Sequence, residues 1–169
     1  MERKSIVALL VGFLLAITLS GCSNTTNQLQ DALQDYTQMV EGNCPEDLCL
    51  TIYYIDPHIL TRKPISATEL MNFPGVKKVI VESETLATQF ERFKKLDASI
   101  LKPIEENSDI NARLYYVFET GESGKILEVT ICDADSSVIV NGIEVETNSV
   151  FYELIEPFLS QEDRNMLGF

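Results

Sequence analysis

The sequence predicts an α+β fold, in which a two-layer antiparallel sheet built from a meander of hairpins carries flanking helices. Between residues 111 and 145, segments rich in β-branched and aromatic residues alternate with tight-turn sequences. Apolar stripes at helical spacing lie outside that stretch, at 29–40 and 150–158. Strands that follow one another through tight turns, with helices kept apart from them, are typical of an antiparallel sheet covered by helices.

The first 21 residues have the pattern of a secretory signal peptide. Charged residues near the start are followed by an apolar run over 6–19 and then by the small residues Ser20 and Gly21. The apolar run is shorter than the roughly 20 residues that a helix needs to cross a bilayer. A cleaved leader is therefore favoured over a permanent transmembrane helix.

The sequence Leu19-Ser20-Gly21-Cys22 resembles the lipobox of bacterial lipoproteins. In that family the cysteine receives a thioether-linked diacylglycerol, the leader is cut just before it, and the new amino group is often acylated. The resemblance implies lipidation of Cys22, a lipidated tether at 22–28, and a location on the extracytoplasmic face of the cell membrane or outer membrane. More than one acyl chain matters, because a single chain binds a membrane only marginally at about 0.8 kcal/mol per buried methylene.

The mature chain is short and strongly acidic. Cleavage before Cys22 removes 21 of the 169 residues and leaves 148, which suits a single folded domain over 29–169. It also removes Glu2, Arg3 and Lys4, a net charge of +1, so the formal net charge changes from −13 to −14. This charge disfavours nucleic acid and anionic lipid headgroups as partners. We expect no nucleic-acid partner, and contact with the membrane through the acyl chains.

The elements before the hairpins can be placed in order. Residues 29–40 carry the stripe of a short amphipathic helix, which either docks on its own domain, as we favour, or serves as a stalk or partner helix. Residues 48–55 and 76–81 have the composition of strands. Ser66-Ala67-Thr68-Glu69 forms a capping box that starts a short helix between them. Ser83 is expected to cap the helix that follows the second strand.

The hairpins give the most specific predictions. With a loop at 121–124, the strands 112–120 and 125–132 bring together apolar pairs, which are Leu114 with Ile131, Tyr116 with Val129 and Phe118 with Leu127. The opposite face, with Arg113, Tyr115, Glu119, Glu128 and Thr130, is expected to be partly exposed. Asn141-Gly142 predicts a second hairpin, and the stripe at 150–158 predicts a final helix that is interrupted near Pro157 and followed by a capped turn at Ser160.

Three cysteines remain beside Cys22, in a compartment where disulfides form. The number is odd, so at least one thiol stays unpaired within the chain. Cys44 and Cys49, which enclose a four-residue loop, are the favoured possible disulfide. Cys49 with Cys132 is the competing pair, and the third possibility is that no bond forms.

A calcium site is the sharpest metal candidate. The spacing of an EF-hand loop is matched by oxygen donors at Asp133, Asp135, Ser137, Asn141 and Glu144. Val138 stands where that loop requires glycine, and 141–142 already predict a hairpin turn. An acidic turn between two hairpins is therefore the favoured interpretation, and no metal is predicted.

Other chemistry has little support in the sequence. Cys44, Cys49, Cys132 and the single histidine, His58, are zinc-type donors, but they lack the second close pair that structural zinc sites use. His58 is the one histidine available as a general base, in a turn without a companion motif, so a solvent-facing histidine is favoured. We predict no catalytic residue and no cofactor.

These observations favour a membrane-anchored, non-enzymatic binding or envelope-associated module, whose partner is an envelope protein or a small ligand. The alternatives are a small inhibitory or immunity-type lipoprotein and a hydrolase. A hydrolase needs a cleft where polar side chains converge, near His58. A binding module is expected to show a concave or aromatic sheet face, for which Tyr53 or Tyr54 and Tyr115 are candidates, although core or edge packing is favoured for them. An inhibitor is expected to show a protruding loop, such as 59–64 or 121–124.

Overall fold

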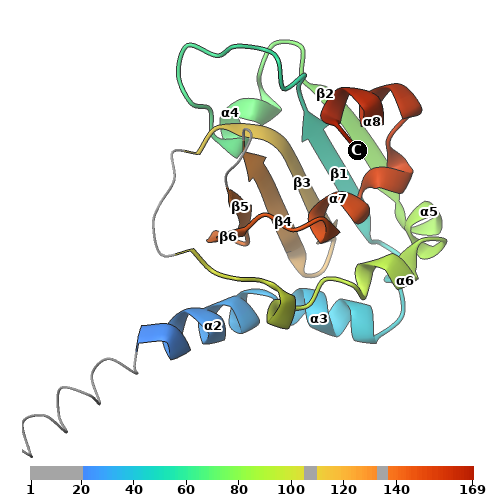
Figure 1. The fold of residues 1–169 in the computed structure, drawn as a ribbon. Coiled ribbons are helices and arrows are strands. Elements are labelled where there is room, and N and C mark those ends of the chain that lie inside the picture. The colour runs from blue at the N-terminus through green and yellow to red at the C-terminus, as the bar shows by residue number, and fades with distance from the viewer. Residues whose placement is uncertain (1–20, 105–109, 133–136) are drawn as a thin grey trace, which may run out of the picture.

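A computed structural model describes residues 21–104, 110–132 and 137–169, with the backbone alone for 21–26. It contains a six-stranded antiparallel sheet with the strand order β2-β1-β3-β4-β5-β6 (Figure 1). The predicted α+β fold is confirmed. Within the described ranges, no helix has both the length and the apolar character that a membrane crossing requires.

The elements follow one another closely. The strands are β1 (Cys49–Tyr54), β2 (Lys77–Glu82), β3 (Ala112–Thr120), β4 (Gly124–Cys132), β5 (Ser137–Val140) and β6 (Ile143–Glu146). The helices are α2 (Gly21–Ala32), α3 (Gln34–Glu41), α4 (Ala67–Met71), α5 (Ser83–Ala87), α6 (Phe90–Phe93), α7 (Val150–Glu153) and α8 (Gln161–Leu167). The described part of the chain also contains two 3₁₀ turns, η1 (Ala98–Ile100) and η2 (Glu156–Phe158).

The main core lies on one face of the sheet, under most of the helices. Phe118 of β3 packs edge-on against Phe93 of α6 at a ring-centroid distance of 5.0 Å. The buried tyrosines place their hydroxyls on backbone carbonyls: Tyr36 donates to Phe93 O at 2.7 Å and Tyr116 to Phe151 O at 3.0 Å. These hydrogen bonds satisfy polar groups that burial would otherwise leave unpaired, and they join α3 to α6 and β3 to α7.

The side chains on the second face of the sheet are more buried than expected. Tyr115 and Val117 of β3 pack with Leu70 of α4 in a separate apolar cluster. Tyr115, Arg113 and Thr130 are 3%, 6% and 7% exposed, so the expectation of partial exposure is wrong for these three residues. Glu119 is exposed and Glu128 is half-buried, so it holds for these two. The reason for the burial is α4, a short helix that covers the middle of this face and that strand periodicity cannot place.

The predicted register of the first hairpin and the predicted second hairpin are both confirmed. The first pairs Leu114 with Ile131, Tyr116 with Val129 and Phe118 with Leu127. The second pairs Val138 with Val145 and Val140 with Ile143. Its turn residues Asn141 and Gly142 have φ angles of 45° and 83°, the left-handed values that this two-residue turn requires.

Asn141 also joins the hairpin to the first helix. Its Oδ1 accepts from Glu128 N at 2.7 Å, and its Nδ2 donates to Ala32 O at 2.5 Å and to Ile126 O at 3.3 Å. One side chain thus satisfies three backbone groups, two in β4 and one at the end of α2.

The N-terminal helix docks on the domain, as favoured. Leu29, Leu33, Tyr36 and Val40 are all buried in the main core, and the helix breaks at Leu33 into α2 and α3. The helix begins at Gly21 and not near Leu29, so the segment expected to be a tether has a helical backbone. Because a helical residue advances 1.5 Å and an extended one about 3.4 Å, these seven residues reach about 10 Å, less than half of what an extended tether would span.

Two of the three expected helix caps are present. Ser66 Oγ accepts from Glu69 N at 3.2 Å and Glu69 Oε2 accepts from Ser66 N at 2.9 Å, the reciprocal pair of a capping box. Ser160 caps α8 through its Oγ, which accepts from Asp163 N at 3.1 Å. The expected cap at Ser83 is wrong, because Ser83 is the first residue of α5 and its hydroxyl donates to Glu46 O at 2.6 Å.

The two edges of the sheet differ. Along β6 runs the segment 102–104, where Ile104 N donates to Glu144 O at 2.9 Å and Glu146 N donates to Lys102 O at 2.8 Å. Along β2, no strand from the described part of the chain pairs with the outer side. One edge is covered by the chain itself and the other is open.

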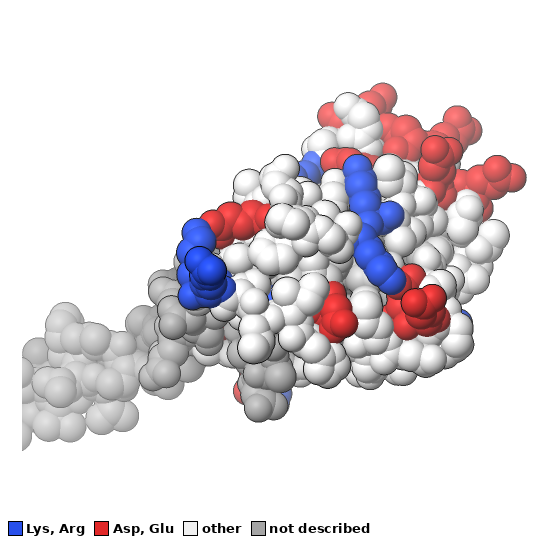
Figure 2. Space-filling model, turned by 90° about the horizontal axis from the view of Figure 1, so that it is seen from above, with Lys and Arg blue, Asp and Glu red and all other residues white. Residues whose placement is uncertain are grey.

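Charged side chains are unevenly spread over the end of the molecule that carries the loop between β1 and α4. Figure 2 looks onto this end and shows lysine and arginine side chains in separate groups on a largely uncharged surface, with acidic side chains gathered towards one side. The negative net charge is therefore no guide to the local charge at this end.

Candidate functional site

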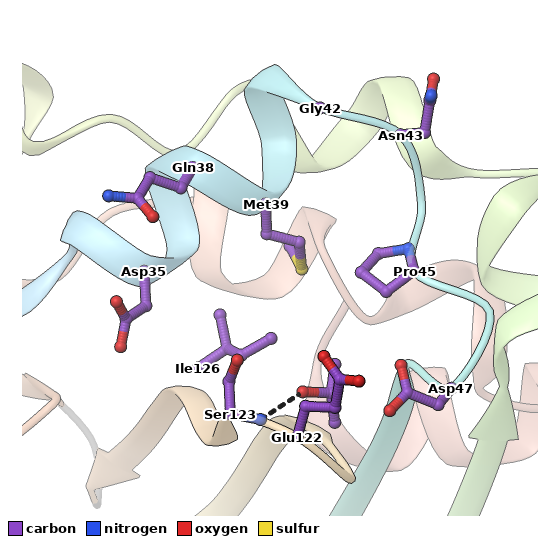
Figure 3. Close-up of a pocket in the computed structure, with 11 residues that line it drawn as sticks. Asp35, Gln38, Met39, Gly42, Asn43, Pro45, Asp47, Glu122, Ser123 and Ile126 are labelled. Atoms are coloured by element: carbon purple, nitrogen blue, oxygen red, sulfur yellow. Dashed lines mark hydrogen bonds between the residues drawn. The ribbon is translucent and has the colours of Figure 1, made fainter.

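A cleft of about 310 Å³ opens between the C-terminal end of α3 and the turn that joins β3 to β4 (Figure 3). Met39 and Ile126 point into the space between the helix and the turn, and Pro45 closes one side. The other lining residues are Asp35, Gln38, Gly42, Asn43, Asp47, Thr120, Glu122 and Ser123.

The walls of this cleft are held by short-range contacts. Gly42 N donates to Gln38 O at 3.2 Å and to Met39 O at 3.3 Å, which ends α3 and turns the chain towards the sheet. Asp47 Oδ2 accepts from Gly121 N at 2.8 Å, so the loop before β1 and the β3–β4 turn are tied together. A side chain at Gly121 would place its Cβ only 3.3 Å from that carboxylate oxygen, so the contact favours glycine there.

The chemistry of the cleft is acidic. Asp35, Asp47 and Glu122 contribute carboxylates, and the lining set contains no lysine, arginine, histidine or cysteine. Such a cleft suits a cationic group, for example a basic side chain of a partner. Across the described residues, no group of three histidine, cysteine or acidic side chains is placed to hold a metal ion.

His58 lies on an exposed turn, as favoured from the sequence. Its backbone N donates to Asp56 Oδ1 at 2.8 Å and its Nδ1 lies 2.9 Å from the same oxygen. The backbone hydrogen bond and the imidazole contact hold the pKa of the Asp56 carboxyl below its usual range. The His58 side chain is 88% exposed, and no residue of this turn lines the cleft, so His58 and the cleft are separate features of the surface.

Cys44 and Cys49 lie near the same end of β2, where Cys44 Sγ is close to Ser83 O and Cys49 is opposite Glu82, whereas Cys132 lies at the other end of the sheet. Cys44 and Cys49 are free in the structure, and the disulfide between them stays a prediction. Partial burial raises the pKa of the Cys44 thiol, whose sulfur lies 3.9 Å from Ser83 O. The competing pair is excluded by register: Cys49 is opposite Glu119 and Cys132 is opposite Ala112, at the two ends of β3, about 24 Å apart at ~3.4 Å per residue.

Part of the calcium candidate lies outside the described residues, namely Asp133 and Asp135. Of the remaining donors, Ser137 starts β5 and Asn141 follows its end, so their Cα atoms are about 13 Å apart along an extended strand. The Oδ1 of Asn141 is already used by Glu128 N. The described donors therefore do not form the compact loop of an EF-hand, and the acidic-turn interpretation needs no metal.

The aromatic contact surface is not formed. Tyr54 and Tyr115 are 1% and 3% exposed, so the interpretation of these tyrosines as a contact surface is wrong and the alternative of core packing holds. Tyr115 stacks on Tyr53 at 6.1 Å between ring centroids and donates from its hydroxyl to Glu128 at 3.1 Å.

The loop between β1 and α4 carries the most exposed of the large hydrophobic side chains that the structure describes. Leu60 is 95% exposed and its neighbour Ile59 is 37% exposed. Figure 1 places this loop at the end of the domain opposite to α2. Sequence reasoning marked 59–64 as a loop able to protrude, but exposure of Leu60 depends on the absence of any covering element, which the sequence does not encode locally.

Comparison with known proteins gives no relative: no protein-family model, no curated protein and no solved structure matches the chain.

Proposed function

We propose that this protein is a lipoprotein anchored through Cys22 on the extracytoplasmic face of a membrane, and that it binds a protein partner of the cell envelope through the loop between β1 and α4. The observation that carries the proposal is the 95% exposure of Leu60 on that loop. A large apolar side chain gains roughly 1.5–3 kcal/mol when it leaves water, so a pocket on a partner would bind it favourably.

The loop is already ordered by its own hydrogen bonds. At its start, Ile59 N donates to Asp56 O at 3.0 Å, beside the contacts between Asp56 and His58. At its end, Lys63 Nζ donates to Glu69 Oε1 at 2.7 Å and thereby joins the loop to the capping box of α4. A loop that is held in one shape loses less conformational entropy on binding, which favours a docking role.

The position of the loop supports a protein partner and not a lipid surface. The N-terminal helix α2 leads away from the opposite end of the domain, and a lipid on Cys22 would lie beyond that end (Figure 1). Leu60 would then point away from the membrane that holds the protein, towards other envelope components.

An inhibitory protein is the second candidate, and the same loop favours it. A protruding, preordered loop with an exposed leucine has the form of a segment that enters the active site of an enzyme. The two functions differ in outcome, because an inhibitor lowers the activity of its partner on binding and a simple docking module does not.

The anchor is tested by mass spectrometry and membrane fractionation of the full chain. The wild type is expected to lose residues 1–21, to carry acyl chains on Cys22 and to sediment with membranes, and Cys22→Ala is expected to remove the lipid and prevent that cleavage. Cys44→Ala is the matched control and is expected to behave as wild type. An unlipidated wild-type chain contradicts the anchor without bearing on the loop.

The docking loop is tested with a photo-crosslinking amino acid in living cells. At position 60 it is expected to give one discrete adduct, whose partner can then be purified to measure its activity with and without this protein. The same amino acid at Glu41, an exposed position at the other end of the domain, is the control. Equal labelling at both positions, or no adduct at position 60, contradicts the docking role.

A further inference from the structure

The open edge of the sheet, along β2, is apolar in its middle. Ile80 is 55% exposed, and Val79 beside it is half-buried. A groove of about 540 Å³ follows this edge, and Pro157 and Phe158 form its far wall. An edge strand presents unpaired N–H and C=O groups that can extend the sheet with another strand.

We propose that β2 pairs antiparallel with β2 of a second copy of this chain, which joins two six-stranded sheets into one. This inference rests on the edge itself and is independent of the anchor and of the loop at Leu60. Its support is the order of five residues along the strand, Lys78-Val79-Ile80-Val81-Glu82, which is complementary to its own reverse.

Symmetry restricts how two copies can pair. A twofold axis between antiparallel strands of one sheet stands perpendicular to the sheet, so residues directly opposite each other must lie on the same face. The pairs of β1 with β2 show that Val79 and Val81 lie on the face of Ile52 and Leu50, in the main core. Lys78, Ile80 and Glu82 lie on the other face, since side chains alternate along a strand. The axis must therefore pass through a residue.

Centring the axis on Ile80 matches the five positions from Lys78 to Glu82 and leaves Lys77 opposite Ser83, just beyond the strand. Ile80 then faces Ile80 of the second copy, and Val79 faces Val81 of the second copy. Lys78 faces Glu82 of the second copy, and Glu82 faces Lys78 of the second copy. The apolar centre is therefore flanked by two pairs of opposite charge. Such cross-strand pairs each stabilise a sheet by roughly 0.2–1 kcal/mol, and like charges in the same places destabilise it.

Other symmetric registers fit less well. Centring on Val79 places Lys78 opposite Ile80 and Lys77 opposite Val81. Centring on Val81 places Ile80 opposite Glu82. Each alternative sets a charge against an apolar side chain and removes the charge pairs. The charges thus select one register, although lysine on an edge strand more often prevents pairing.

The two lysines of β2 are placed differently, which suits this register. Lys77 is engaged within its own chain, where its Nζ donates to Asp163 Oδ1 at 2.6 Å. Lys78 Nζ lies 5.2 Å from the centroid of the Tyr53 ring, on the Ile80 face, and makes no ion pair with a described residue. On the core face, the groove beside Pro157 and Phe158 provides space for the valines of the second copy.

The test is the oligomeric state of the full chain, purified in detergent and followed by sedimentation velocity over a range of concentrations. The wild type is expected to show a reversible monomer–dimer equilibrium. Lys78→Glu, which sets two glutamates against each other at both ends, and Glu82→Lys are each expected to weaken dimerisation about tenfold or more. The double variant Lys78→Glu/Glu82→Lys restores opposite charges and is expected to recover the dimer.

Recovery by the double variant separates this register from other dimers. Lys78 and Glu82 are exposed, so the variants are expected to fold, and unchanged thermal unfolding checks this. Lys94→Glu, at an exposed lysine outside β2, is the matched control and is expected to leave the equilibrium unchanged. A wild type that stays monomeric overturns the proposal, as does a dimer that neither single reversal weakens or that the double variant fails to restore.

Discussion

The two edges of the sheet are protected by different means. At β6, the segment 102–104 supplies two backbone hydrogen bonds, and Pro103 forms a bridge with Val145. At β2, the outer side has no strand from the described residues against it, and only charges and a short length limit its pairing. A covered edge has its backbone groups occupied and cannot pair with a further strand. A charged open edge can still pair, but only with a strand whose charges are complementary.

The covering segment at β6 is positioned by the residues just before it. Asp97 accepts from Ser99 N at 2.7 Å and so starts the 3₁₀ turn η1. Leu101, 6% exposed, then fixes the chain in the main core before it reaches β6. The cover is thus an extension of the core, and the open edge has no equivalent.

The largest effect is expected from uncovering β6. Leu101→Ala removes the buried side chain that holds the segment and is expected to lower the free energy of unfolding by about 3 kcal/mol. Hydrogen exchange should show faster exchange at the amides of Ile104 and Glu146, while the amides that join β1 to β3 change less. Ile100→Ala, at a side chain that is 42% exposed, is the matched control and should be near neutral. Equal loss in both variants would contradict a special role for Leu101.

A smaller effect is expected at the turn of the hairpin that forms the covered edge. Asn141→Ala removes the three hydrogen bonds of this side chain and places alanine at a φ of 45°, so we expect a loss of about 2 kcal/mol in urea unfolding.

Asn141→Gly separates the two causes. Glycine adopts positive φ without strain, so this variant should lose only the hydrogen-bond contribution and be more stable than Asn141→Ala. Equal stability of the two variants would show that backbone strain contributes nothing at this turn.

The open edge should respond in the opposite way. Ile80→Lys changes an exposed side chain, so in dilute protein the free energy of unfolding should change by no more than about 0.5 kcal/mol. Self-pairing adds a dependence on concentration, because a dimer stabilises its folded protomers by mass action. Melting temperatures measured from low to high protein concentration should therefore diverge, with the wild type rising and Ile80→Lys staying level. The same concentration dependence of the melting temperature in both proteins would contradict self-pairing at this edge.

The features that the sequence predicts well are those set by neighbouring residues. The register of β3 with β4 follows from alternation and a loop of fixed length, and the turn at Asn141 follows from the tolerance of two residues for positive φ. The capping box at Ser66 also needs only four consecutive residues. Local geometry decides each of these, so a local pattern is enough.

The features that it predicts poorly depend on which elements meet. Tyr115 alternates onto a face expected to be partly wet, but α4 covers it. Ser83 has the chemistry of a cap, yet its hydroxyl reaches Glu46, 37 residues earlier in the chain. The acidic cleft brings Asp47 to Gly121, and β2 lies at an edge because it pairs with β1 alone. None of these contacts leaves a periodic signal in the sequence.

The smallest effect concerns the lysine of β2 that is engaged within its own chain. Lys77 donates to Asp163 and holds the pKa of that carboxyl below its usual range, with Ser160 contributing less. A carboxyl whose pKa is lower in the folded state stabilises the fold above its unfolded pKa, and this contribution is lost as the pH falls through the folded pKa. Lys77→Met should raise the pKa of Asp163 in an NMR titration, and its stability should approach that of the wild type in acid. Lys78→Met should leave the pKa of Asp163 unchanged, since Lys78 lies on the other face of the strand. There we expect it to pair with Glu82 of the second copy.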